Sequence, residues 1–269
     1  MTESKSITII IASYNDERIL KAIASVRKFD DDNSVKIAVI DGGSDPELCR
    51  KINSELTAED QFVSEKDGGV FDALNKGLRI ASTEYIGWLG SDDFFTGEVI
   101  ASDVSRVLQR SDLFIGVCEL FSGTRISRKT SSWLCKYKLA LKLGVHNPHY
   151  STFGRAELLK AYAFSTTNKA ADIGYFLRVF DTAESIATSN KTFVYQAVGG
   201  FSNRSIRGIC EVNLHAAEYY GALACVAIPV KLFRKALSSV VHKVRKRAIS
   251  QDCMGYLHCA VPTRLIDTS

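Results

Sequence analysis

Two adjacent carboxylates, Asp92 and Asp93, carry the clearest chemistry in this chain, and they directly follow an apolar run. Neighbouring carboxylates supply the hard oxygen ligands that Mg²⁺ or Mn²⁺ uses when it bridges a diphosphate. An isolated Asp-Asp pair is more often a solvated turn. The interpretation as a metal site therefore depends on where the fold places the pair.

Polar clusters recur after three other strand-like runs, giving four in all. Each cluster alone is explained more simply as a polar turn or a helix cap. Their occurrence at consecutive strand ends favours one ligand site, because ligands of parallel sheets bind outside the carboxyl ends of the strands. The three further clusters are Ser13-Tyr14-Asn15-Asp16, Asp41-Gly42-Gly43-Ser44-Asp45 and Glu65-Lys66-Asp67-Gly68-Gly69.

Strands and helices alternate in the first 118 residues, which predicts an α/β fold with a parallel sheet covered by helices on both faces. Short β-branched and apolar runs predict the strands, and apolar residues at three- and four-residue intervals predict the helices. The Asp45-Pro46 pair predicts an N-cap followed by proline in the first turn. Strands are expected at Ile7 to Ala12, Val35 to Ile40, Gln61 to Val63, Tyr85 to Leu89 and Leu113 to Cys118, and helices at Glu17 to Arg27, Pro46 to Leu56, Val70 to Ser82 and Gly97 to Arg110.

Composition excludes several other classes of protein. With 269 residues, 46% of them hydrophobic, the chain is long enough for a sizeable core and is neither disordered nor fibrous. A net charge of +4 argues against a dedicated nucleic-acid binder. The seven cysteines never form a C-x-x-C pair, and neither G-x-G-x-x-G nor a P-loop motif occurs, so zinc-site, dinucleotide-fold and P-loop interpretations are not supported.

No targeting segment is apparent at the start of the chain. The polar residues 1 to 6 run straight into a strand-like stretch, without the order of regions that a signal peptide needs. No apolar run approaches the roughly 18 residues of a membrane-spanning helix. We therefore expect a cytoplasmic protein, with attachment to the membrane surface left open.

Taken together, these clusters resemble the motifs of family 2 inverting glycosyltransferases with the GT-A fold. The resemblance is strongest over residues 7 to 95, and the block Glu65 to Gly77, which ends in Asn-Lys-Gly, is its most specific part. It continues more weakly through Pro148 to Phe153, Ala171 to Arg178 and Gly199 to Ser202. Within the family the chain looks most like bacterial enzymes that build O-antigen, capsule or other lipid-linked surface polysaccharide.

The resemblance implies a donor site for a nucleotide sugar, with UDP favoured over dTDP and GDP. Mn²⁺ or Mg²⁺ is the implied cofactor, held mainly by Asp93, while Asp92 contacts the metal, its water or the ribose. Ser91 stands where a full D-x-D motif has its first aspartate. The other implied donor-site residues are Ser13, Tyr14, Asn15 and Asp41 for base and ribose, Asp67 near the uracil, and Asn75 and Lys76 on the sugar-phosphate side.

On the acceptor side, the resemblance implies that Asp172 is the catalytic base of an inverting, β-forming transfer. A carboxylate within hydrogen-bond reach can take the proton of an attacking hydroxyl. The alternative is that Asp172 caps a helix from Ile173 to Phe180; the other nearby acids are Glu157 and Asp181. His149 is assigned to the acceptor or diphosphate side, with a structural loop role as the alternative and His146 as its competitor.

Two basic stretches suggest anionic partners: the first is expected near the acceptor, and the second on an anionic membrane surface. Six basic residues and no acid lie between Arg125 and Lys142, and seven basic residues and no acid between Lys231 and Arg247. In the second stretch apolar residues also fall on one helical face, which suits a helix lying in an anionic surface. The alternative is that this face packs on the catalytic domain.

The resulting expectation is a GT-A catalytic domain over residues 1–212, divided near residue 118 into a nucleotide-sugar half and an acceptor half. A basic, membrane-associating helical segment would follow over residues 213–269, and the acceptor would be a glycan on a polyprenyl diphosphate. Two other functions stay open at this stage: a sugar nucleotidyltransferase of similar fold and a non-catalytic nucleotide-sugar-binding module. The acidic balance after the first strand disfavours the nucleotidyltransferase.

Overall fold

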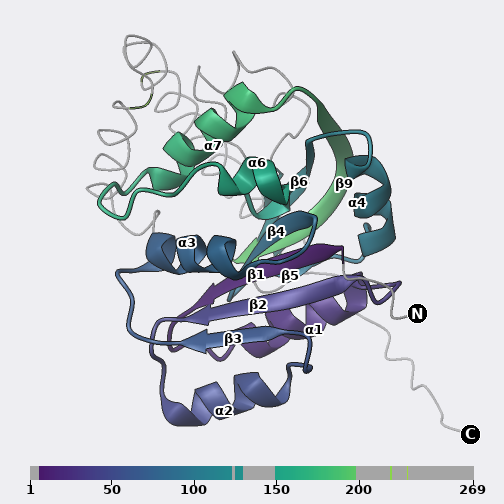
Figure 1. The fold of residues 1–269 in the computed structure, drawn as a ribbon. Helices are drawn as coiled ribbons and strands as arrows, with labels where there is room; N and C mark the ends of the chain where they lie inside the picture. Colours follow the sequence, from purple (N-terminus) through teal and green to yellow (C-terminus); the bar gives the residue numbers. More distant parts are fainter. Residues whose placement is uncertain (1–5, 123–124, 130–148, 198–218, 220–228, 230–269) are drawn as a thin grey trace, which may run out of the picture.

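The computed structural model describes residues 6–122, 125–129 and 149–197, together with residues 219 and 229. Within these residues the chain forms a nine-stranded mixed sheet with helices on both faces (Figure 1). The strands are β1 (Ile7–Ser13), β2 (Val35–Asp41), β3 (Gln61–Ser64), β4 (Tyr85–Gly90), β5 (Phe94–Phe95), β6 (Leu113–Ser122), β7 (Arg125–Lys129), β8 (Thr152–Arg155) and β9 (Ile186–Ala197). The helices are α1 (Ile19–Phe29), α2 (Pro46–Ser54), α3 (Val70–Ile80), α4 (Ala101–Leu108), α6 (Ala156–Lys160) and α7 (Ala171–Thr182), with a 3-10 turn, η2, at His149–Ser151.

The sheet order is β3-β2-β1-β4-β8-β6-β9-β5, with β7 paired to β6. Strands β1 to β4 run parallel, as the sequence predicts, and each predicted strand and helix of the first half is present with ends shifted by a few residues. Strand β8 enters antiparallel between β4 and β6, and β9 then adds parallel to β6. The second half of the chain therefore extends the same sheet.

Alternate residues of the strands feed two separate cores, because successive side chains of a strand point to opposite faces. In β1, Ile9 and Ile11 pack with α1, α2 and α4, whereas Ile10 packs with α3, α6 and α7. Figure 1 shows α1 and α2 on one side of the sheet and α3, α6 and α7 on the other. Burial on both faces explains why β1 is a continuous apolar run in the sequence.

Helix α3 lies unusually close to the sheet because it has a glycine at the contact. A Cβ atom added to Gly77 would lie 2.4 Å from Cγ2 of Ile10, which is nearer than packed carbon atoms approach. The close approach fixes the position of α3 relative to β1. Since the loop that precedes α3 carries Asp67, this contact also fixes one wall of the candidate site.

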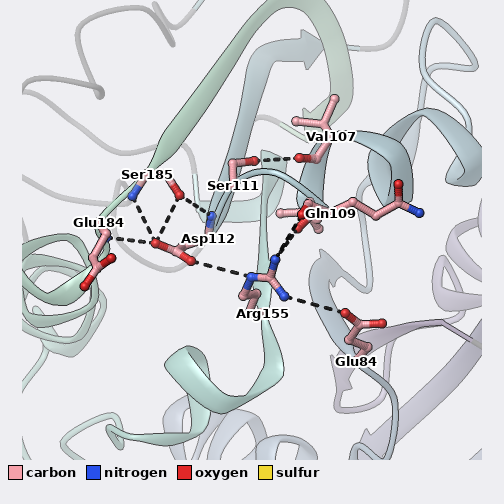
Figure 2. A network of polar contacts seen from close by, with 9 residues as sticks. Glu84, Val107, Gln109, Ser111, Asp112, Arg155, Glu184 and Ser185 are labelled. Atoms are coloured by element: carbon pink, nitrogen blue, oxygen red, sulfur yellow. Dashed lines mark hydrogen bonds and ion pairs between the residues drawn. The ribbon is translucent and has the colours of Figure 1, made fainter.

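A polar clamp holds the amino-terminal edge of the sheet, opposite the candidate site (Figure 2). Asp112, just before β6, accepts hydrogen bonds of 2.8 and 2.9 Å from the backbone N–H groups of Glu184 and Ser185. Arg155 at the end of β8 lies 3.5 Å from Asp112 and 3.6 Å from Glu84, and it donates to the carbonyl oxygen that ends α4 at 2.9 Å. The clamp thus joins β4, β6, β8 and the start of β9.

The expected basic helical segment over residues 213–269 lies outside the described residues, except for Tyr219 and Pro229, and so do residues 130–142 of the first basic stretch. Among the described helices, none has the length and apolar character needed to cross a membrane.

Candidate functional site

The loops that follow β1, β2, β3 and β4 meet at one edge of the sheet because the strands are in parallel register. Ser13 pairs with Asp41, Asp41 pairs with Ser64, and Ala12 pairs with Gly90. The four polar clusters picked out from the sequence therefore follow strand ends that lie at the same edge of the sheet. The geometric part of the prediction, that they converge, is met.

Asp41 organises the loop after β2 from the inside. Its side chain is fully buried, and its carboxylate accepts hydrogen bonds from the backbone N–H groups of Gly43 and Ser44, at 3.1 and 2.8 Å, and from the Ser64 hydroxyl at 2.7 Å. Burial opposes ionisation, but the hydrogen bonds from Ser44, Ser64 and Gly43 hold the pKa of Asp41 below its usual value. Asp41 therefore shapes the loop and does not itself form its surface.

Asn15 ties the first loop to the second. Its backbone has φ +46°, and its N–H group donates to the Ser44 hydroxyl at 2.7 Å. Its side-chain oxygen accepts from the Asp45 N–H group at 2.9 Å. Next to it, the ring of Tyr14 is 66% exposed at the edge of the site, whereas the Ser13 hydroxyl is buried without a hydrogen-bond partner among the described residues.

The loop after β3 folds over the second loop. Asp67 accepts a hydrogen bond from the Gly69 N–H group at 2.8 Å, and its other carboxylate oxygen lies 3.2 Å from where a Cβ atom of Gly42 would be. A side chain at position 42 would therefore crowd the carboxylate. Glycine here lets Asp67 lie directly above the Asp41 loop.

The two predicted residues of α3 have different surroundings. Lys76 forms an ion pair with Glu65 at 2.8 Å and lies 3.7 Å from Asp72, so it stays at the loop surface. Asn75 is buried, and its amide nitrogen and oxygen are hydrogen-bonded to the backbone of Phe164 at 2.9 and 2.8 Å. Asn75 thus supports the site through the backbone of Phe164, whereas the sequence interpretation placed it on the sugar-phosphate side.

Asp93 is the most buried of the candidate metal ligands. Its side chain is 2% exposed, Oδ1 accepts a hydrogen bond from the Ala197 N–H group at 2.9 Å, and Oδ2 has no hydrogen-bond partner in the described part of the chain. Burial and the neighbouring charge of Asp92 raise the pKa of Asp93 to about 7. A buried carboxylate oxygen without a partner is energetically costly, and a bound cation or a proton would reduce that cost.

Asp92 and Asp93 fit a divalent cation, because they offer neighbouring carboxylates and Oδ2 of Asp93 has no hydrogen-bond partner among the described residues. The described residues contain no cluster of three or more potential His, Cys, Asp or Glu ligands. A metal held by two carboxylates and completed by substrate phosphates and water is the usual arrangement for Mg²⁺ in phosphate chemistry. The site is therefore suited to a metal that binds together with a diphosphate.

Asp172 lies in the first turn of α7, on the acceptor half. The N-cap residue of this helix is Ala170, and no side chain caps it, so the structure does not support the capping alternative for Asp172. The carboxylate is partly exposed and lies 4.0 Å from Nδ1 of His149. Asp181 lies nine residues further along α7, roughly 13 Å away at 1.5 Å per residue.

His149 is a neutral partner of this carboxylate. Burial lowers the pKa of His149 to about 4, and its ring packs against Tyr150 with ring centroids 3.9 Å apart. At neutral pH the imidazole is uncharged and therefore acts through hydrogen bonding and packing. Its competitor from the sequence, His146, lies outside the described residues.

Tyr150 joins the two halves of the site. Its ring packs against both hydrophobic cores. Burial raises its pKa, and the negative charges of Asp93, Asp92 and Asp172 raise it further. One phenol is thus within electrostatic reach of the candidate metal ligands and of the candidate base.

Sequence reasoning missed two residues of this site, Tyr150 and Arg18. Arg18 Nη1 lies 3.3 Å from Asp92 Oδ2. The signal for Arg18 was present, since it is the basic residue of an acidic loop that follows a strand. Tyr150 lies within the block Pro148 to Phe153 that carries part of the resemblance, but its role at the site could not be predicted, because its position depends on η2 packing against β4, β6 and β9.

Comparison with known proteins agrees with this arrangement. The family model described as "Glycosyl transferase family 2" matches residues 8–168 of the chain. An uncharacterized glycosyltransferase of Mycobacterium tuberculosis is 32% identical over 109 residues, which cover 40% of this chain and 42% of that protein. The glycosyltransferase GlyA of Streptococcus pneumoniae is 26% identical over 120 residues, or 43% of this chain and 17% of that protein. The matched segment is thus under half of each relative.

Solved structures show the same fold. TarS 1–349 of S. aureus in complex with UDP-GlcNAc superposes with a TM-score of 0.59 at 17% identity, covering 80% of this chain and 67% of that one. The mannosyltransferase PcManGT of Pyrobaculum calidifontis, in complex with GDP-Man and Mn²⁺, superposes with a TM-score of 0.59 at 16% identity, covering 95% and 82%. The expected GT-A architecture, an α/β sheet flanked by helices, is confirmed.

Proposed function

Because the chain belongs to glycosyl transferase family 2, we propose that it transfers a sugar from a nucleotide sugar to a hydroxyl group of a glycan acceptor. The observation that carries the proposal is that Asp92, Asp93 and Asp172 are all close enough to Tyr150 for their negative charges to raise its pKa. A transferase needs one site that holds the leaving diphosphate and another that activates the attacking hydroxyl. Asp92 and Asp93, in the loop after β4, would serve the first site, and Asp172, in the first turn of α7, would serve the second.

In this proposal the loops after β1, β2 and β3 bind the nucleotide. The exposed ring of Tyr14 is available for stacking on the base, and Asp67 supplies a carboxylate above Gly42. Ser13, whose buried hydroxyl has no hydrogen-bond partner among the described residues, and Asn15 complete the base and ribose side. Asp41 and Asn75 act as positioning residues, since their polar atoms are bonded within the protein.

The donor is a UDP-hexose or UDP-N-acetylhexosamine, and the cofactor is Mn²⁺ or Mg²⁺. Support comes from TarS structures described with UDP-GlcNAc and with UDP, and from PcManGT described with GDP-Man and Mn²⁺. Asp93, with Asp92 beside it, would hold the metal. When bound, the metal neutralises the charge that develops on the departing nucleoside diphosphate.

The proposed reaction is a single displacement. The Asp172 carboxylate accepts the proton of the acceptor hydroxyl while that oxygen forms a bond to the anomeric carbon. The bond between the anomeric carbon and the diphosphate oxygen breaks, and its electron pair leaves with the nucleoside diphosphate. Attack from the opposite face inverts the anomeric centre, so an α-linked donor gives a β-linked product.

His149 and Lys76 have supporting roles. Neutral His149 lies 4.0 Å from the Asp172 carboxylate and packs beside it without adding a positive charge. Lys76, in α3, places a positive charge beside Glu65 and Asp72, on the sugar-phosphate side.

The acceptor in this proposal is a glycan on a polyprenyl diphosphate, within surface polysaccharide synthesis at the cytoplasmic face of a membrane. Residues 1–212 form the catalytic domain and residues 213–269 the membrane-associating segment. The support is the seven basic residues and absence of acids between Lys231 and Arg247, since anionic lipids attract such segments.

A screen of nucleotide sugars tests the proposed function. The full chain is incubated with mass-tagged UDP-, dTDP- and GDP-sugars, with Mn²⁺, Mg²⁺ or EDTA, and with synthetic lipid-diphosphate sugars as acceptors. We expect metal-dependent hydrolysis or transfer with a UDP-sugar. If no donor is consumed with either metal, the transferase proposal fails; donor binding without turnover would instead favour the non-catalytic module.

A further inference from the structure

The guanidinium of Arg18 is fixed at the edge of the metal-binding carboxylates. Its Nε and Nη2 atoms donate to the two oxygens of Asp16 at 2.8 and 3.0 Å, which makes a bidentate pair. Asp16 is itself held by the Ser91 hydroxyl at 2.8 Å. The pair thus links the loop after β1 to the loop after β4, and such a fork restrains the guanidinium in orientation as well as in place.

The remaining nitrogen of Arg18 faces the candidate metal site. Nη1 lies 3.3 Å from Asp92 Oδ2, while the Arg18 side chain stays 60% exposed and the Asp92 side chain 24% exposed. The positive charge of Arg18 therefore already compensates Asp92 without any bound ion. A second cation entering beside Asp92 and Asp93 would be repelled by it.

We propose that Arg18 acts as a resident cation of the donor site: it neutralises Asp92 while no metal is bound, and it binds the donor diphosphate once a metal takes over that carboxylate. This inference rests on the proposed function and adds a positioning residue to it. Arginine suits the second role, because its planar fork binds phosphate oxygens in pairs. The Asp16 tether keeps the guanidinium at the site in both states.

Loss of the Arg18 charge should change the affinities for the metal and for the nucleotide in opposite directions. Removing the charge of Arg18 relieves the competition for Asp92, so metal alone should bind more tightly. The same change removes a contact with the diphosphate, so the nucleotide should bind more weakly. If Arg18 had only a structural role, the same change would weaken the binding of both ligands.

The test measures Mn²⁺ binding by the full chain, without nucleotide, from the electron paramagnetic resonance signal of free Mn²⁺. We expect Arg18→Gln to bind Mn²⁺ about three- to tenfold more tightly than wild type, and to bind UDP in saturating Mn²⁺ at least about tenfold more weakly by calorimetry. Arg18→Lys, which keeps the charge, should match wild type in Mn²⁺ affinity. Arg106→Gln, on α4 and paired with Asp103, controls for the change in net charge.

Unchanged or weaker Mn²⁺ binding by Arg18→Gln, in a protein that melts like wild type, would overturn the inference, and so would tighter Mn²⁺ binding by Arg18→Lys. If the glutamine variant does not fold, Arg18→Met, which keeps the apolar stem, is held to the same expectations. If wild type binds Mn²⁺, Asp93→Asn does not, and Arg18→Gln binds it as wild type does, this inference is rejected and the proposed function stands. Absence of Mn²⁺ binding by wild type rejects the inference and also removes the metal from the proposed function.

Discussion

Asp93 carries a buried carboxylate oxygen that no group of the described chain satisfies. Folding places this group in an environment that favours its protonated form, which is why its pKa is raised to about 7. In the unfolded chain the same carboxyl has a pKa of about 4. Ionisation of Asp93 therefore opposes folding at neutral pH unless a cation compensates it.

Metal-free protein should consequently lose stability as the pH rises. Because the folded-state pKa is raised, the contribution of protonated Asp93 is complete below pH ~4 and is lost as the pH passes through 7, a change of up to about 4 kcal/mol. Asp93→Asn should flatten this dependence. Urea unfolding in EDTA between pH 4 and 8 measures it, and Mn²⁺ added at pH 8 should restore part of the loss in wild type alone. Equal pH slopes for the two proteins would contradict this assignment.

His149 gives a second prediction at the scale of one residue. Its pKa is lowered to about 4 by burial, so it should stay neutral throughout the physiological range. NMR of ¹⁵N-histidine-labelled protein, with His149→Gln to assign the signal, should show no titration of His149 between pH 5 and 8. A midpoint near 6.5 would mean that the imidazole is exposed, and that its contact with Asp172 is ionic at acidic pH.

At the scale of elements, the site depends on strands that the sequence does not reveal. The sequence predicted β1 to β4, β6 and the first four helices, because local periodicity is strong where strands are buried on both faces. It predicted neither β8 nor β9. Strand β8 has four residues and gains its place only by pairing with both β4 and β6, which are distant in sequence.

The same reason explains which site residues could be predicted. The sequence could predict that the loops carrying Asp41, Asp67 and Asp93 lie at one edge of the sheet, because parallel register brings strand ends together; the ligand roles of these residues stay predictions. Asn75 was assigned to the ligand side, although α3 turns it toward the backbone of Phe164. Contacts made across the sheet by the second half of the chain decide such cases, and no local pattern encodes them.

The clamp around Arg155 provides a prediction at this scale. Arg155→Ala removes contacts with Asp112, Glu84 and the end of α4, so we expect a loss of roughly 1–3 kcal/mol in unfolding free energy. The clamp is at the edge of the sheet opposite the site. Mn²⁺ and UDP affinities of the folded variant should therefore equal those of wild type.

Urea unfolding and calorimetry check the two parts of this expectation. Arg106→Ala, which breaks an exposed ion pair within α4, is the matched control and should change stability by less than about 0.5 kcal/mol. If Arg155→Ala costs no more than this control, the clamp does not hold β8 in place.

At the scale of the whole molecule, the charge of the chain is unevenly distributed. The net charge is +4, yet the segment from Lys231 to Arg247 contributes seven positive charges, so the remainder carries −3. A strongly basic segment is thus joined to a remainder that is slightly acidic. Such an arrangement suits a protein that takes a cation-bound donor from solution and an acceptor from an anionic surface.

Membrane attachment through this segment should be measurable. In flotation assays with vesicles containing anionic lipid, the full chain should float, and a chain truncated at residue 228 should not. Binding should also decrease with added salt, because screening weakens attraction between the basic residues and the headgroups. Equal flotation of the two proteins would remove the membrane role from this segment.

The central claim is that the carboxylates of the loop after β4 and of α7 form one active site, with donor and acceptor functions on opposite sides. The most direct test compares Asp172→Asn with wild type and with Asp181→Asn, the acid further along the same helix, once a donor is identified. We predict that Asp172→Asn retains the UDP and donor-sugar affinities of wild type but loses transfer by about 10²- to 10⁴-fold, while Asp181→Asn keeps both. Transfer by Asp172→Asn at the wild-type rate would contradict the account.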